Sequence, residues 1–257
     1  MRSAFLVLAF FLAGCAHTMD NKELRDEFAP QGALRVGVNY GNPVIVQRDP
    51  AGGAPRGIGP DLARELARRL GLEVKYVTYE SAGKMTDGLV NDKAWDIAFL
   101  AVDPKRAQEI AFSPPYVEIE GTYLVKSDAP FKAIADVDKP GVRIAVGRGS
   151  AYDLFLTREL KNAQLVRTTQ VPESMQALAE GKADVVAGVK QSLDAVAKPG
   201  LRVMPGNFMV IRQASGVPQG RPKAAAYLTR FIEEMKTSGF VRKSLDASGN
   251  TEAPVAK

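Results

Sequence analysis

The sequence contains very few of the residues that build disulfides, metal centres and nucleophilic catalytic sites. Among its 257 residues there is one cysteine, Cys15, and one histidine, His17. A single cysteine cannot form a disulfide within the chain, and transition-metal sites take several ligands, drawn largely from cysteine and histidine. Because both residues lie close to the N-terminus, no Ser-His or Cys-His pair can be assembled in the body of the chain. The sequence therefore predicts no disulfide, no metal site and no cofactor.

A strong excess of one charge is also absent. Lysine and arginine number 34 and aspartate and glutamate 29, so the net charge is +5, or +4 without Arg2. The basic residues are spread along the chain, and no basic block has aromatic residues interleaved with it. Nucleic-acid binding depends on a clustered basic surface, so the sequence gives it little support.

Long hydrophobic runs are absent except at the N-terminus, where residues 4–13 are almost all apolar after a basic start at Arg2. This run is too short for a permanent membrane span, which needs about 20 residues. The order of charged start, apolar core and small residues predicts a signal peptide over residues 1–14. Leu12-Ala13-Gly14-Cys15 resembles the bacterial lipoprotein box, which implies that Cys15 becomes the lipidated first residue. The alternative is an ordinary signal peptide that happens to end near a cysteine.

Residues 15–32 are polar and charged and predict a tether between the lipid and the first strand. The lipidated tether implies a periplasmic protein that is anchored to a membrane. The mature chain of about 240 residues is long enough for one large domain or two small ones.

Beyond the tether, short β-branched runs alternate with amphipathic segments. Strands are expected over 34–38, 74–79 and 97–101, with helices over 60–71 and 83–92. The pattern then restarts, with strands over 141–147, 165–168 and 183–187 and helices over 150–160 and 172–180. Such alternation is typical of α/β proteins with largely parallel sheets.

The restart of the pattern predicts two Rossmann-like lobes. The amphipathic helix expected over 222–238 packs back on the first lobe, so the chain crosses between the lobes twice, near 122–125 and near 203–211. Two crossings make a hinge, and a hinged cleft suits ligand capture. The predicted units are lobe 1 (33–121 plus 206–245), lobe 2 (126–202) and a tail (246–257).

Several segments resemble, in family order, the type II periplasmic solute-binding proteins of family 3, the polar amino-acid branch that serves ABC importers. They cover about residues 32–245 and include Gly32 to Val38, Gly57 to Ala63, Trp95 to Ala98, Ala111 to Tyr116, Val142 to Ser150 and Gly181 to Val185. The resemblance implies a monomeric protein that is not an enzyme. It also implies a small-molecule ligand between two α/β lobes and an ABC permease in the inner membrane as partner.

Arg106 is the sharpest candidate for ligand binding. In similar proteins the arginine at this position pairs with the ligand carboxylate. A planar guanidinium matches a carboxylate with two parallel hydrogen bonds, which lysine cannot supply. The alternative is a solvated arginine at a helix start, although a cation there is mildly unfavourable.

The turn at Ser150 and Ala151 resembles the family's ligand-binding Gly-Thr-Thr turn. A strand ends and a helix begins there, which leaves free backbone N–H groups directed at the cleft. Ser150 can also act only as the helix N-cap, and the two roles are compatible.

Other positions depart from the family pattern. Ala101 stands where the family usually has serine or threonine, and Tyr40 and Asn42 stand where it has an aromatic that stacks on the ligand. The amino-acid binders place an aspartate near position 189 for the α-ammonium group, whereas this chain has Val189 followed by Lys190.

A buried ammonium without a counter-charge costs several kcal/mol. The missing aspartate therefore means that the ligand has no α-ammonium or that another acid pairs with it. Glu118 and Glu120 are possible substitutes, unless they are a solvated pair on an edge strand. Lys190 can meet a second acidic group of the ligand, or it is a surface lysine before a helix.

Three functions fit this sequence to different degrees. The first is capture of a small carboxylate, such as an amino acid, an amino-acid derivative or an organic acid, for an ABC importer. The second is a sensory or accessory role beside a receptor or an oxidoreductase, which the sequence does not separate from import. The third is the activity of the cyclohexadienyl dehydratase that uses the same fold. Its catalytic glutamate lies near the position that Val189 and Lys190 occupy here, so this chain lacks that glutamate.

Replacing Cys15 with serine tests the lipid anchor. We expect Cys15→Ser to move the protein from the membrane fraction to the soluble fraction, because the thiol that would carry the lipid is gone. Cell fractionation followed by immunoblotting measures this, and a variant that remains with the membranes would refute lipidation.

Overall fold

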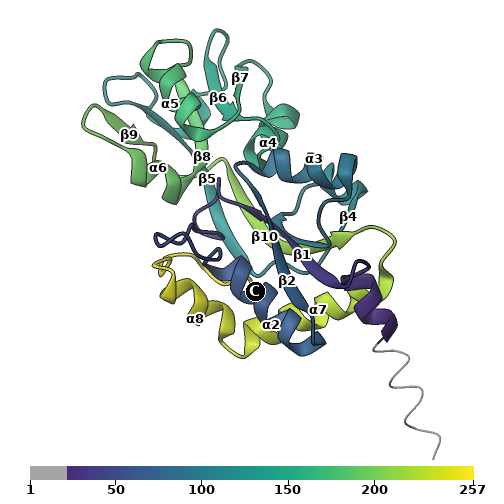
Figure 1. The fold of residues 1–257 in the computed structure, drawn as a ribbon. Helices are drawn as coiled ribbons and strands as arrows, with labels where there is room; N and C mark the ends of the chain where they lie inside the picture. The colour runs from purple at the N-terminus through teal and green to yellow at the C-terminus, as the bar shows by residue number, and fades with distance from the viewer. Residues whose placement is uncertain (1–21) are drawn as a thin grey trace, which may run out of the picture.

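Residues 22–257, which the computed structural model describes, contain one mixed sheet of ten strands with helices packed around it (Figure 1). The strands are β1 (Ala33–Asn39), β2 (Glu73–Tyr79), β3 (Ile97–Ala101), β4 (Ile110–Phe112), β5 (Val117–Lys126), β6 (Arg143–Gly147), β7 (Gln164–Thr168), β8 (Val185–Val189), β9 (Leu201–Val203) and β10 (Met209–Pro218). The expected signal peptide, Cys15 and His17 lie outside the described residues. Within residues 22–257 no helix is long and apolar enough to span a bilayer.

The sheet order is β2-β1-β3-β10-β5-β8-β6-β7, with β4 paired to β10 and β9 paired to β5. Two parallel groups of strands, β1–β3 and β6–β8, flank the long strands β5 and β10, which run antiparallel to their neighbours. We call the group around β1–β3 the first half and the group around β6–β8 the second half.

The helices follow the expected alternation. They are α2 (Ile58–Leu70), α3 (Ala82–Asp92), α4 (Ala151–Glu159), α5 (Val171–Ala179), α6 (Lys190–Val196), α7 (Pro222–Thr237) and α8 (Phe240–Ala247), with short 3-10 turns η1 (Arg106–Gln108) and η2 (Ile134–Asp136). In α2 the expected stripe of Leu62, Leu66 and Leu70 is buried, as the four-residue spacing of an amphipathic helix requires. The prediction of an alternating α/β chain is confirmed, while α8, β4 and β9 were not expected.

The two halves use the same Arg–Asp pair to tie a first strand to the strand beside it. In the first half, Arg35 of β1 donates from Nε and Nη2 to the Asp96 carboxylate at 2.8 and 2.9 Å. In the second half, Arg143 of β6 donates to Asp184 at 3.1 and 2.8 Å. Asp96 also accepts from Arg221 at 3.0 Å and is fully buried. The repeated pattern in the sequence thus corresponds to a repeated structural unit.

Strands β5 and β10 carry the chain between the halves, and they meet at Gly121. Residues 117–121 of β5 pair with β10, and residues 121–125 pair with β8. A Cβ atom on Gly121 would lie 2.7 Å from the Met209 Cγ atom, so a larger residue there would force the Met209 side chain to move. The first crossing therefore lies just before the expected 122–125, and the second lies within the expected 203–211. The expected lobe boundaries remain a prediction, because β5 and β10 belong to both halves.

The two ends of the described chain both pack on the first half, which differs from the expected tether and tail. Residues 22–28 are helical, Phe28 is fully buried, and its ring meets that of Tyr227 edge to face at 6.0 Å. Leu24 and Phe28 are spaced by four residues, so a helix puts both on one apolar face. Residues 22–32 are therefore part of the folded body rather than a free tether.

The expected tail, 246–257, adds to the edge of β5. Val255 forms a β-bridge with Val117, and the backbone N–H of Ala256 donates to the Tyr116 carbonyl at 3.1 Å. Ala253 and Ala256 are both buried. This backbone pairing explains why a short, mixed sequence is held against the sheet.

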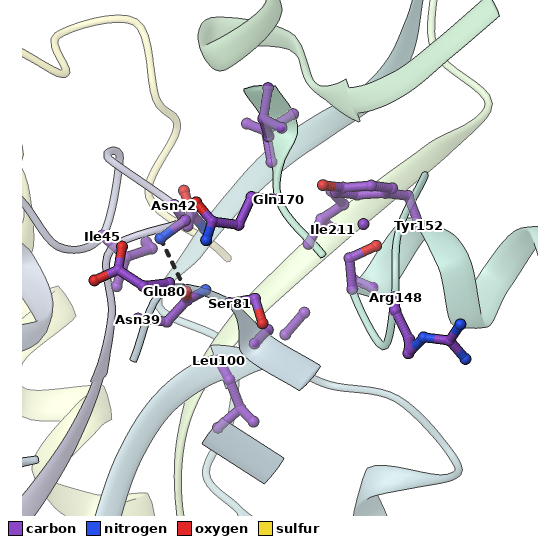
Figure 2. A pocket seen from close by; sticks show the side chains of 18 of the residues that line it. Asn39, Asn42, Ile45, Glu80, Ser81, Leu100, Arg148, Tyr152, Gln170 and Ile211 are labelled. Atoms are coloured by element: carbon purple, nitrogen blue, oxygen red, sulfur yellow. Dashed lines mark hydrogen bonds between the residues drawn. The ribbon is translucent and has the colours of Figure 1, made fainter. Parts of the chain in front are cut away.

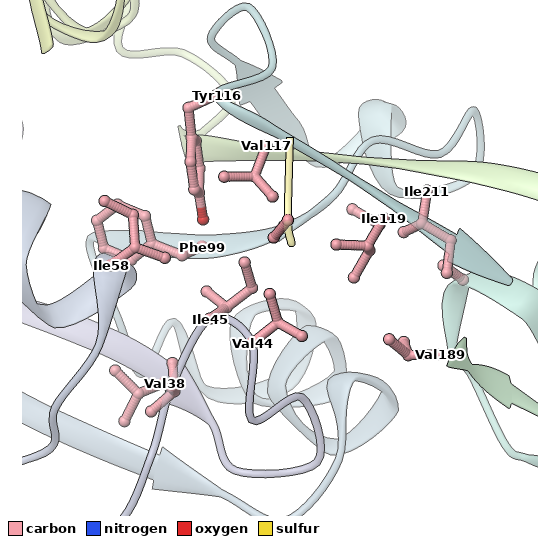
Figure 3. Close-up of a cluster of buried hydrophobic side chains, with 14 of the residues drawn as sticks. Val38, Val44, Ile45, Ile58, Phe99, Tyr116, Val117, Ile119, Val189 and Ile211 are labelled. Carbon is pink, nitrogen blue, oxygen red and sulfur yellow. The ribbon is translucent and has the colours of Figure 1, made fainter. Parts of the chain in front are cut away.

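A single apolar cluster runs from the first half to the base of the second (Figure 3). Phe99 and Tyr116 meet edge to face at 6.3 Å beside Ile45, and Ile211 and Val189 continue the cluster toward the second half. Burial of the Tyr116 hydroxyl raises the pKa of that side chain. The cluster thus forms the apolar base of the region between the halves, which we call the apolar floor.

The two Arg–Asp pairs differ in burial and provide a matched test of their contribution to stability. We expect Asp96→Ala to lower the free energy of unfolding by about 3 kcal/mol, because it leaves two largely buried guanidinium groups without a carboxylate. Asp184→Ala should cost about 1 kcal/mol, because that pair is partly exposed. Urea unfolding measures both, and equal losses would contradict this assignment.

Candidate functional site

A cavity of about 70 Å³ lies between the two halves, beside β10, and its walls come from both (Figure 2). The first half and β10 contribute Asn39, Asn42, Ile45, Glu80, Ser81, Phe99, Leu100, Ala101, Arg106, Ile211 and Gln213. The second half contributes Gly147, Arg148, Ser150, Ala151, Tyr152, Thr169, Gln170, Val171 and Val189.

Much of the polar wall follows the carboxyl ends of parallel strands. Glu80 and Ser81 come directly after β2, and Thr169 and Gln170 come directly after β7, the matching edge strand of the second half. In open α/β sheets, ligands bind just beyond these strand ends. The two halves turn their strand ends toward each other, so a polar space lies above the apolar floor.

Arg106 connects the two halves at this cavity. Its Nη1 donates to the Ala101 carbonyl at 2.9 Å, and its Nη2 donates to the Gly149 carbonyl of the second half at 2.9 Å. The side chain is buried, and its Nε has no hydrogen-bond partner. Burial lowers the pKa of Arg106 to about 10, with the nearby Asp103 carboxylate acting in the opposite direction. The group is therefore a buried cation at neutral pH.

No carboxylate among the described residues forms an ion pair with Arg106, and Asp103, whose charge acts on the pKa of Arg106, is engaged elsewhere. Asp103 pairs with Arg158 of α4 at 2.9 Å and accepts from the backbone N–H of Lys105 at 2.8 Å. Since Asp103 is on the first half and Arg158 is on the second, this pair is a second connection across the cleft.

The backbones of the two halves also touch. A Cβ atom on Gly83, in the first turn of α3, would lie 2.5 Å from the Arg148 carbonyl oxygen, and one on Gly149 would lie 2.7 Å from the Gly83 Cα. Both positions therefore need glycine for the halves to approach this closely.

The turn at Ser150 has the expected form. Ser150 is the N-cap of α4, and its hydroxyl accepts from the Asp153 backbone N–H at 3.0 Å. Ser150 and Ala151 also line the cavity, beside the buried ring of Tyr152. Burial raises the pKa of Tyr152. The structure therefore places the capping residue where it can also face a ligand.

The other expected site residues divide into two sets. Asn42 and Ala101 line the cavity. Tyr40 does not, because the Arg48 guanidinium covers its ring at 3.9 Å from the centroid. Neither Glu118 nor Lys190 belongs to the cavity wall.

Those two charged residues have partners of their own. Glu118 lies on β5 and pairs with Arg212 at 3.3 Å. Lys190 begins α6 and pairs one turn later with Asp194 at 2.6 Å. Glu120, the other expected acid, accepts from Asn207 at 3.0 Å and is also outside the wall. None of these three residues lines the cavity in this structure, so their expected contacts with a ligand remain predictions.

The sequence interpretation missed Glu80, Arg148, Tyr152, Gln170 and Gln213 as cavity residues. Glu80 and Gln170 follow expected strands directly, so the rule of strand ends was a signal that could have found them. Gln213 lies in the middle of β10, where no signal in the sequence marks it. Among the described residues no cluster of three or more histidine, cysteine, aspartate or glutamate residues could hold a metal ion.

Comparisons with known proteins agree with this geometry. The glutamine-binding protein of Geobacillus stearothermophilus is 26% identical over 188 residues, which is 71% of each chain. An ABC transporter glutamine-binding protein of Bacillus subtilis (strain 168) is 22% identical over 70% of each chain. The crystal structure of a mutant of ArgBP from T. maritima superposes with a TM-score of 0.74 at 24% identity, covering 88% of this chain and 99% of that one.

The likeness to ArgBP confirms the expected fold, a type II periplasmic binding protein with a mixed α/β sheet. The model of one protein family matches residues 34–247, which is most of the chain. The chain therefore belongs to the bacterial extracellular solute-binding proteins, family 3.

Proposed function

We propose that this protein captures a small carboxylate-bearing solute of the amino-acid type between its two halves and delivers it to an ABC permease. The observation that carries the proposal is Arg106, a buried cation in the cavity wall without a carboxylate partner in the described chain. A ligand carboxylate supplies the missing counter-charge.

The energetics of burial support an anionic group on the ligand. An unpaired buried charge costs several kcal/mol, whereas charge-assisted hydrogen bonds to a carboxylate are about twice as strong as neutral ones. The two carbonyls that Arg106 now contacts are neutral acceptors. A carboxylate near the unpartnered Nε forms a stronger pair, and the N-terminus of α4 at Ser150 adds backbone donors for an anion.

The relatives support the class of solute and the partner. Two of them are named as glutamine-binding proteins, and one of these as part of an ABC transporter. We propose the same kind of partner here, with lipidated Cys15 holding the protein at the membrane beside its permease.

We propose binding rather than turnover. A general acid needs a carboxyl group poised over the substrate. Glu80 is the carboxylate in the cavity wall, and it is about half exposed and paired with Arg48.

Substitution of Arg106 tests the site. Wild-type protein screened by thermal shift against the L-amino acids should show a raised melting temperature with at least one of them, because a ligand that binds the native state stabilises it. Arg106→Ala should weaken binding of that amino acid about a hundredfold or more in calorimetry, and Arg106→Lys should not restore it, because lysine lacks the planar fork.

Arg242→Ala is the matched control for this substitution. Arg242 also donates to two backbone carbonyls and has an unpartnered Nε, but it forms an ion pair with Asp246 at 2.8 Å and lies outside the cavity wall. The control should bind as the wild type does. Undiminished affinity in a folded Arg106→Ala variant, as judged by circular dichroism, would overturn the site.

Removal of the ion pair between Asp103 and Arg158 tests whether this pair holds the two halves together. We expect Arg158→Ala to favour separation of the halves by about 1–3 kcal/mol, because it leaves a buried carboxylate without its partner. Small-angle X-ray scattering without added ligand should then give a larger radius of gyration than the wild type. Lys182→Ala, which breaks a pair within the second half, is the control and should leave the radius unchanged.

A further inference from the structure

Glu80 is the only carboxylate among the described residues that line the cavity. The other acids nearby do not line the cavity and have partners within the protein. Asp103 is paired with Arg158, and Asp153 is paired with Arg167 at 2.9 Å and accepts from the Gly149 N–H at 2.7 Å. Glu80 is therefore the one acid that can neutralise a cationic group held in the cavity.

The strand register brings Glu80 close to Asn42. Strands β1 and β2 are parallel with Asn39 opposite Tyr79, so the residues after each strand leave the sheet together. The backbone N–H of Tyr40 donates to the Tyr79 carbonyl at 2.9 Å, and a Cβ atom on Gly41 would lie 2.9 Å from the Glu80 carbonyl oxygen. Glu80 and Asn42 thus project from two adjoining loops on one wall (Figure 2).

Asn42 provides a second, independent sign of a ligand donor at this wall. Its Oδ1 atom is buried and accepts no hydrogen bond. Buried amide oxygens in native proteins nearly always have a donor, so an orphan of this kind at a cavity marks a place for a ligand N–H. Gln170 faces the same region from the second half (Figure 2).

The ion pair of Glu80 with Arg48 does not prevent Glu80 from binding a ligand cation. Glu80 forms an ion pair with Arg48, whose guanidinium also lies over the Tyr40 ring. Both charged side chains are about half exposed, at 47% and 60%. An ion pair this exposed contributes little free energy, so a ligand cation can replace Arg48 at small cost.

We propose that Glu80, with Oδ1 of Asn42, binds the ammonium group of the ligand. Glu80 then supplies, from the first half, the negative charge that is absent at Val189 on the second half. The ligand class is a zwitterion whose carboxylate lies at Arg106 and whose ammonium lies toward β1 and β2. This assignment rests on the proposed function, because the proposed function places the carboxylate of the ligand at Arg106.

The test compares amino acids with their des-amino analogues. The probes are L-glutamine, L-cysteine and L-arginine beside 4-carbamoylbutanoate, 3-mercaptopropanoate and 5-guanidinopentanoate, each titrated by calorimetry into the full mature chain. Wild type should bind at least one amino acid more tightly than its analogue. Glu80→Gln should weaken binding of that amino acid about tenfold to a hundredfold and change the affinity for its analogue less than about threefold.

Two control variants separate charge from structure. Glu118→Gln makes the same substitution in another half-exposed Glu–Arg pair outside the cavity and should bind as the wild type does. Arg48→Ala removes the competing cation, so amino-acid binding should be retained or tightened. If Glu80 only held Arg48 in place for the loop, Arg48→Ala would weaken binding as much as Glu80→Gln does, and that result would overturn the proposal.

The outcomes also distinguish this proposal from the function on which it rests. Arg106→Ala should weaken the binding of amino acids and of their des-amino analogues alike. If it does so while Glu80→Gln binds every amino acid as the wild type does, the carboxylate site stands and the ammonium assignment is wrong. Failure of the wild type to bind any of the three amino acids, or binding of the analogues as tightly as the amino acids, also overturns the assignment.

Discussion

The cleft is organised around one buried positive charge. The Arg106 guanidinium lies between a carbonyl at the end of β3 and a carbonyl in the turn after β6, so it touches both halves at once. A cation that is buried among neutral acceptors is held at a cost in solvation, and an incoming anion lowers that cost. The same guanidinium thus lies at the proposed ligand site and joins the two halves, because its two contacts belong to different halves.

The strands around this charge follow the same structural pattern in both halves. Arg35 with Asp96 and Arg143 with Asp184 fix corresponding strands in the two halves, and the carboxyl ends of those strands form opposite walls of the cavity. The two walls differ in chemistry. The first half supplies Glu80, the Arg106 guanidinium and the amides of Asn39 and Asn42, whereas the second supplies Arg148, Gln170, Tyr152 and the N-terminus of α4 at Ser150. Under the proposed assignment, a zwitterion is oriented with its carboxylate at Arg106 and its ammonium at Glu80.

The sequence was sufficient for the parts of this arrangement that depend on periodicity or on local motifs. The alternation of strands and helices, the N-cap at Ser150 and the place of Arg106 after β3 follow from such patterns. The approach of Glu80 to Asn42 did not, because it depends on the pairing of β1 with β2. Glu118 and Lys190 were misleading for a related reason. Their partners, Arg212 across the sheet and Asp194 one turn along the helix, become visible only when the neighbouring elements are placed.

The contact between Gly83 and Gly149 has a consequence for how selectivity arises. Because backbone meets backbone there, no change of side-chain rotamer would let the two halves approach more closely at this contact. The depth of the closed cavity is then a fixed dimension of the scaffold, and ligand size is filtered by the side chains that project into it. A methyl group added at either glycine would force the two halves apart at this contact, whichever solute is bound.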